Sequence, residues 1–174
     1  MRAFFSIHIN ENAAEHILNA LPKNQEVLWY PRQNLHITLQ FVGEVMANEM
    51  LKLFKIGEDA AQKISAFLLQ PSKIIFTEDR IRLTIEPHPN LIKLHDLIAE
   101  ALKSENLGKL DENLYTPHIT LGRVSKTSRD LPEIQPDFKN YEIPVNSFGI
   151  FLSEQGANNM GLYTLFKEFK LSWF

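Results

Sequence analysis

A four-residue word, His-Ile-Thr-Leu, occurs twice in this chain, at residues 36–39 and 118–121. Pro31 and Pro117 precede the two copies, as is typical where a loop leads into a strand. Successive side chains of an extended strand alternate between its two faces, so the His and Thr of each copy share one face. The pattern therefore predicts two strands that each present an imidazole and a hydroxyl on one face and apolar side chains on the other.

Periodicity along the rest of the chain predicts further strands and three helices. We expect Asn10 and Asn90 to cap two of the helices, and Gly43 to end the first motif strand. A polar stretch at residues 125–140 is typical of a long surface loop. The predicted strands span residues 3–9, 35–42, 67–69, 74–76, 80–86, 115–124, 143–153 and 162–171, and the apolar stripe of the middle helix runs from residue 50 to 64.

This order of elements favours an α+β fold. We expect two pseudo-symmetric lobes, each a mostly antiparallel sheet with outer helices, and an active-site cleft between them. The length of 174 residues suits a single bilobal domain spanning residues 1–174.

Composition excludes several classes of protein. The chain has no cysteine, which rules out disulfides, thiol catalysis and thiolate metal ligands and suits a reducing cytoplasm. Its net charge of -3, from 18 basic and 21 acidic residues, gives no global basic field for binding long nucleic acids. No signal peptide or membrane-spanning stretch is recognisable, so we expect a cytoplasmic protein without a membrane partner.

The paired motifs can support acid–base chemistry. If both strands face one cleft, His36 and His118 can act on opposite sides of a phosphorus atom, one as acid and one as base. Thr38 and Thr120 can donate hydrogen bonds to the phosphate oxygens. These residues alone do not distinguish the acid from the base. A catalytic zinc would need a third ligand that the pattern does not supply, so we expect no metal and no cofactor.

The two words and their flanks, Asn34–Gly43 and Thr116–Val124, resemble the 2H phosphoesterase superfamily, and more closely its RNA 2',3'-cyclic phosphodiesterase (2'-5' RNA ligase) family. Arg2–Phe5, Ser153 and Tyr163–Leu165 extend the resemblance over almost the whole chain. It implies metal-independent hydrolysis of a terminal RNA 2',3'-cyclic phosphate to a 2'-phosphate, with 2'-5' ligation as the reverse reaction in some members. The implied partners are RNA ends or oligonucleotides with a cyclic phosphate, and we expect a monomer.

The resemblance also implies roles for individual residues. His36 matches the proton donor to the leaving 3' oxygen and His118 the base that activates water, while Thr38 and Thr120 match the phosphate-holding hydroxyls. Arg123 matches an arginine that neutralises phosphate or stacks on a base.

Position within the strands leaves two of these side chains open. Simple alternation places Arg123 opposite His118, so it reaches the cleft only if the strand twists or bulges. Phe41 holds the equivalent place after the first motif, where it either stacks on a base or belongs to the core.

Two alternatives remain. The first is another 2H phosphoesterase, which acts on small cyclic nucleotides or on RNA 3' ends. The second is a nucleotide-binding module without turnover, against which the intact His and Thr pairs argue.

Overall fold

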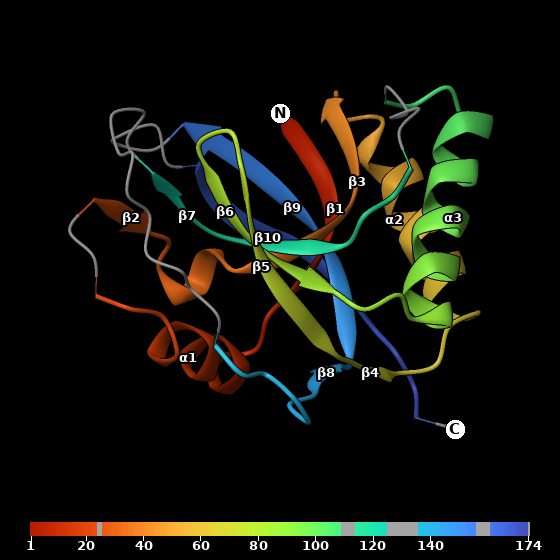
Figure 1. Cartoon of the computed structure of the whole chain (residues 1–174). Helices are drawn as coiled ribbons and strands as arrows, with labels where there is room; N and C mark the ends of the chain where they lie inside the picture. The colour runs from red at the N-terminus through yellow and green to blue at the C-terminus, as the bar shows by residue number, and fades with distance from the viewer. Residues whose placement is uncertain (24–25, 109–113, 125–135, 156–160, 174) are drawn as a thin grey trace.

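The structure is a computed structural model that describes residues 1–23, 26–108, 114–124, 136–155 and 161–173 (Figure 1). Within these ranges, eight strands form one antiparallel sheet with the path β10-β9-β1-β3-β7-β6-β5, and β2 pairs with β7. A separate two-stranded sheet joins β4 to β8. The strands are β1 (Arg2–His8), β2 (Val27–Trp29), β3 (His36–Glu44), β4 (Phe67–Leu69), β5 (Pro71–Thr77), β6 (Arg80–Ile85), β7 (His118–Val124), β8 (Ile143–Val145), β9 (Ser147–Gln155) and β10 (Gly161–Lys170).

The two motif strands, β3 and β7, are neighbours at the middle of the large sheet. They are joined through a single partner pair, Ile37 and Ile119, which are both fully buried. On one side of this junction lie β1, β9 and β10, and on the other lie β6 and β5, while β2 pairs with the edge of β7 opposite β6. The predicted α+β fold with mostly antiparallel strands is therefore confirmed, and its two halves meet where the motifs lie.

The halves exchange elements rather than each folding from a continuous stretch of chain. The C-terminal strands β9 and β10 join the N-terminal β1, and α3, which precedes the second motif, packs on β3 of the first (Figure 1). Helices α2 and α3 pack against each other, and α2 also contacts β9 and β10. The helices are α1 (Glu11–Asn19), α2 (Met50–Ala61), α3 (Pro89–Ser104) and the short 3-10 helix η1 (Arg32–Asn34).

Helix capping agrees with the sequence at one helix and differs at another. Asn10 caps α1, because its side-chain oxygen accepts a hydrogen bond of 2.9 Å from the backbone of Ala13. Asn90 does not cap α3, which begins at Pro89 instead. The ring of His88 accepts the backbone N–H of Asn90 at 3.1 Å and takes the capping role. A proline suits the first helical position because its missing N–H would have no partner there.

Several predicted strand boundaries are wrong, two of them at Gly43 and Asn146. Gly43 lies inside β3 rather than ending it, and its positive φ of 88° is a backbone conformation that glycine adopts without strain. The predicted strand 143–153 is two strands, since the chain changes sheets at Asn146. Most of the predicted loop at 125–140 lies outside the described residues.

Strand β3 contains a register irregularity directly after the threonine of its motif. Thr38 pairs with Ser6 and Gln40 pairs with Phe5, so Leu39 has no partner on β1. An extra residue shifts the alternation of a strand by one position. Phe41, which simple alternation would place opposite Thr38, therefore returns to its face.

Strand β7 has the same irregularity at the equivalent place. Thr120 pairs with Arg82 and Gly122 pairs with Ile81, which leaves Leu121 without a partner on β6. This local bulge returns Arg123 to the face of Thr120. A bulge of this kind was the condition expected from the sequence for Arg123 to approach the cleft.

In the described part of the chain, no helix is both long enough and apolar enough to cross a membrane.

The close approach of β2 to β7 depends on Gly122. A Cβ atom at this position would lie 2.7 Å from the backbone oxygen of Leu28 and 3.2 Å from Cα of Trp29. We therefore expect Gly122→Ala to lower the free energy of unfolding by about 1–3 kcal/mol, because backbone atoms must move to admit the methyl group. Denaturant unfolding would measure this loss.

The control for this prediction is Leu28→Ala in the same strand pair. The Leu28 side chain is 44% exposed, so its removal should change stability by only about 0.5 kcal/mol. Equal losses of unfolding free energy in the two variants would contradict the idea that Gly122 is needed for the close approach of β2 to β7.

Candidate active site

One cavity of about 460 Å³ lies along the faces of β3 and β7 that carry the motif His and Thr residues. It brings together His36, Thr38, Phe41, His118 and Thr120, five of the six site residues expected from the sequence. The other lining residues are Tyr30, Leu39, Gln40, Arg80, Arg82, His95, Leu114, Tyr115, Thr116 and Tyr163.

The two motif histidines are held in the same way. Nδ1 of His36 lies 2.6 Å from the backbone oxygen of Asn34, and Nδ1 of His118 lies 2.8 Å from that of Thr116. A carbonyl oxygen can only accept, so each Nδ1 carries the hydrogen. In the neutral rings, Nε2 is then the unprotonated nitrogen that is available for proton transfer. The repeat thus extends to the hydrogen bond that orients each ring.

Burial makes both imidazoles harder to protonate. The pKa of His36 falls from its ordinary value of 6.5 to about 4, first because the ring is desolvated and then because positive charge on His8 or His118 would repel a second proton. The hydrogen bond to Asn34 opposes this shift. The pKa of His118 is also lowered by burial, and the charge of Arg82 adds to the effect.

The motif threonines are fixed by their strands. Both side chains are half-buried in the cavity wall, while the flanking Ile and Leu residues are buried in the core on the opposite face. The hydroxyl of Tyr115 donates a 3.0 Å hydrogen bond to the backbone oxygen of Thr38, which ties the segment before β7 to β3. The two hydroxyls are therefore available to a ligand in the cavity.

Aromatic rings surround His36. The ring of Tyr163 contacts it edge-on, with centroids 4.9 Å apart and planes at 73°, and the ring of Phe4 lies 5.4 Å away. Phe41 packs on Phe4 at 5.9 Å but is 64% exposed, so the alternative of a core position for Phe41 is wrong. Its exposed ring lines the cavity and can be reached by a base.

The position of Tyr163 depends on a glycine. Its ring folds back over Gly161, where a Cβ atom would lie 2.7 Å from the tyrosine oxygen. The carbonyl of Gly161 also accepts a 3.1 Å hydrogen bond from the side chain of Asn34, whose own backbone oxygen orients His36. The start of β10 is thereby linked to the first motif.

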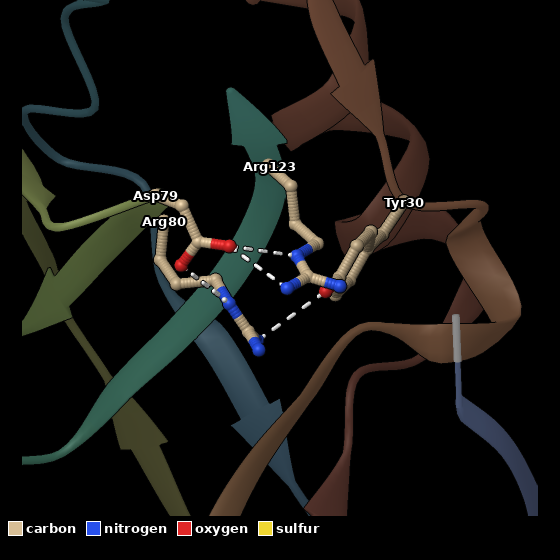
Figure 2. A network of polar contacts seen from close by, with 4 residues as sticks. All are labelled: Tyr30, Asp79, Arg80 and Arg123. Atoms are coloured by element: carbon tan, nitrogen blue, oxygen red, sulfur yellow. Dashed lines mark hydrogen bonds and ion pairs between the residues drawn. The ribbon is translucent and has the colours of Figure 1, made fainter. Parts of the chain in front are cut away.

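Arg123 lies beside the cavity in a network of polar contacts (Figure 2). Its guanidinium donates two hydrogen bonds, of 2.8 and 3.1 Å, to one carboxylate oxygen of Asp79. The other oxygen of Asp79 accepts from Nε of Arg80 at 3.3 Å, and Nη1 of Arg80 lies 3.4 Å from the hydroxyl of Tyr30. The hydrogen bond from Arg123 keeps the pKa of Asp79 below its usual range. Arg80 and Tyr30, but not Arg123, line the cavity.

The cations of β6 were not among the predicted site residues. Arg80, Arg82 and Thr84 alternate with buried apolar residues along this strand, and that polar stripe was the available signal. Only the register shows its importance, since Arg82 pairs with Thr120 and Thr84 with His118.

His95 is a further lining residue that the pattern did not identify. It projects from α3 and stacks on Tyr115, with ring centroids 4.0 Å apart and planes at 8°.

The cavity has the electrostatic character of an anion site. Among the residues that the structure describes, its lining includes two arginines and no carboxylate, in a chain whose net charge is -3. Among the described residues, no group of three or more His, Cys, Asp or Glu side chains is arranged to hold a metal ion. The arrangement can place an anionic group against two hydroxyls and between two titratable rings.

Relatives of known name match most of the chain. An RNA 2',3'-cyclic phosphodiesterase from Thermotoga maritima is 28% identical over 172 residues, which cover 88% of this chain and 87% of the relative. One from Methanocaldococcus jannaschii is 28% identical over 184 residues, covering 97% of this chain and 99% of the relative.

Solved structures share the fold. The protein TT0787 of Thermus thermophilus superposes with a TM-score of 0.82 at 21% identity and covers 99% of both chains. Escherichia coli LigT complexed with 3'-AMP superposes with a TM-score of 0.76 at 23% identity and covers 98% of both chains. The family model of the 2'-5' RNA ligase superfamily matches residues 11–151, and the chain therefore belongs to this superfamily.

Proposed function

We propose that this protein is an RNA 2',3'-cyclic phosphodiesterase that opens the terminal cyclic phosphate to a 2'-phosphate. The observation that carries the proposal is the pair of identically oriented imidazoles, His36 and His118, on adjacent strands in one cationic cavity. The names of the relatives and the nucleotide bound by LigT support the same substrate class.

In the reaction we propose, water attacks phosphorus and the bond to the 3' oxygen breaks. His118 takes a proton from the attacking water, and protonated His36 gives one to the leaving 3' oxygen. After the reaction His118 carries a proton and His36 has lost one, which is the reverse of the starting state. The pair must therefore exchange protons with solvent before the next turnover. Ligation through a 2'-5' bond would be the same chemistry in reverse.

The phosphate would be held by side chains of three strands. Thr38 and Thr120 donate to its non-bridging oxygens, and Arg82, beside Thr120, supplies a positive charge. Phe41 offers an exposed ring on which a base can stack. For Arg123 we propose an indirect role at the edge of this site, in which it fixes Asp79 and thereby Arg80.

The pKa of His36, which burial lowers to about 4, favours a neutral ring in the free protein, whereas a proton donor must start protonated. A bound cyclic phosphate brings a negative charge close to the ring, which raises the pKa of His36 and favours its protonated form. We therefore assign the donor role to His36 in the substrate complex rather than in the free protein.

We further propose that residues 1–174 act as one bilobal domain, as a cytoplasmic monomer and without a metal ion. The shared sheet and the exchange of elements between its halves support the single domain. Arg82 and the motif hydroxyls support metal independence, since they can supply the charge stabilisation that a metal would otherwise provide.

Replacing either motif histidine should abolish most of the activity. We expect His36→Ala and His118→Ala each to lower kcat for a short RNA ending in a 2',3'-cyclic phosphate by roughly 10²–10⁴-fold, because each removes one proton transfer. His16→Ala, on α1 and stacked on Tyr141, is the control and should retain wild-type turnover. Activity lost in EDTA and restored by a divalent ion would contradict the metal-free reaction.

A substrate with sulfur in place of the leaving 3' oxygen separates the two roles. A thiolate leaves without protonation, so the variant that lacks the acid should be rescued and the variant that lacks the base should not. We expect the sulfur substrate to restore His36→Ala by at least about tenfold relative to His118→Ala. Rescue of His118→Ala instead would exchange the two assignments.

The pH dependence of the free enzyme follows from the two lowered pKa values. The profile of kcat/KM reports the essential acid and base of the free protein, and both rings titrate below the ordinary 6.5. We expect a bell-shaped profile with its maximum on the acid side of pH 6.5. Because substrate raises the pKa of His36, the kcat profile should lie at higher pH. A kcat/KM maximum above pH 7 would contradict the burial effect.

A further inference from the structure

The cations of β6 extend beyond the place that the cyclic phosphate would occupy. Arg82 lies beside Thr120 in the register of β6 and β7, whereas Arg80 lies beside Arg123, further along the strands. Residues two apart on a strand share a face and are about 6.6 Å apart. The cavity therefore offers one guanidinium at the proposed reaction centre and another about one strand step away.

The guanidinium of Arg82 is suited to the cyclic phosphate itself. Among the described residues, its buried Nε has no hydrogen-bond partner, and its charge acts on His118. A terminal cyclic phosphate carries a single negative charge. Arg82, the two hydroxyls and the imidazoles already suffice to hold this single charge. The cyclic phosphate therefore gives no reason for a second arginine in the cavity.

Arg80 is fixed in place by its neighbours, so it forms a built feature of the cavity wall (Figure 2). Asp79 and Tyr30 contact it at 3.3 and 3.4 Å, and Arg123 takes the other oxygen of Asp79. One carboxylate is thus shared by two guanidinium groups, so Asp79 by itself does not neutralise both. Asp79 itself does not line the cavity, whereas Arg80 and Tyr30 do.

We propose that Arg80 and Tyr30 form a second phosphate subsite, which binds the phosphate on the 5' side of the terminal nucleotide. An RNA chain that ends in a 2',3'-cyclic phosphate has its nearest other phosphate at this position. The subsite rests on the proposed function. It makes the enzyme selective for RNA ends over free nucleoside cyclic phosphates, which lack the second anion.

Three substrates with the same base test the subsite. They are adenosine 2',3'-cyclic phosphate, its 5'-phosphorylated form, and the dinucleotide ApA ending in a 2',3'-cyclic phosphate. Relative to adenosine 2',3'-cyclic phosphate, we expect wild type to favour one or both of the substrates that carry a phosphate on the 5' side of the terminal nucleotide. The preference should be at least about tenfold in kcat/KM, as a charge-assisted hydrogen bond would provide. Arg80→Gln should remove that preference and leave turnover of the plain cyclic nucleoside within about threefold of wild type.

The control is Lys73→Gln, which removes an exposed cation from the adjoining strand β5 and should change none of the three substrates. An equal loss on all three in Arg80→Gln would overturn the subsite, because Arg80 would then serve the reaction centre or the fold. A wild type without preference, or a preference that survives Arg80→Gln, would overturn it as well. Preference for the dinucleotide alone, lost in Arg80→Gln, would identify a phosphodiester as the ligand.

A binding measurement separates this inference from the proposed reaction. We expect calorimetry to show tighter binding of adenosine 2',5'-bisphosphate than of adenosine 2'-monophosphate to wild type, and equal binding of the two to Arg80→Gln. If binding shows this difference but the protein hydrolyses none of the three substrates, the subsite would stand and the proposed phosphodiesterase activity would be rejected. Equal binding of the two ligands to wild type, together with no kinetic preference for the dinucleotide, would reject the subsite.

Discussion

The pairing of β3 with β7 is the contact on which the site depends. A single residue pair, Ile37 with Ile119, joins the two halves of the large sheet, and both side chains are buried. Because partners in an antiparallel pair point to the same face, the residues on either side of this junction turn together to the opposite face. His36 and His118 share this face on adjacent strands for this reason, although 82 positions of sequence separate them. The exchange of β9, β10 and α3 between the halves packs other elements around the junction.

Local irregularity then determines what else reaches the cavity. The unpaired Leu39 and Leu121 reset the alternation of their strands, and Phe41 and Arg123 return to the face of the motif hydroxyls. Both motifs therefore share a bulge as well as a sequence. The outcomes differ, since Phe41 presents an exposed ring to the cavity while Arg123 is drawn to Asp79 at its edge.

The electrostatics of the cavity combine burial with an excess of positive charge. Burial favours neutral imidazoles, and the arginines of β6 favour an anionic ligand. These effects act together when an anion binds, because its charge offsets the cations and restores the protonation that burial had opposed. In the reaction that we propose, binding of the substrate therefore favours the protonated His36 that acid catalysis needs. The chain as a whole carries the opposite sign of charge, so the attraction comes from the local arginines and not from the net charge.

The sequence by itself determined the elements and the chemical pairs. Alternation and helical periodicity located most strands and helices, and the repeated word named the histidines and threonines that line the cavity, because these are short-range patterns. Only the tertiary structure decided which strands became neighbours. Arg80, Arg82 and Tyr30 reach the cavity because of the register of β2, β6 and β7. His95 reaches it through the packing of α3, and Tyr163 through the C-terminal strand β10. The bulges at Leu39 and Leu121 were likewise absent from the local pattern, since a bulge is defined against a partner strand.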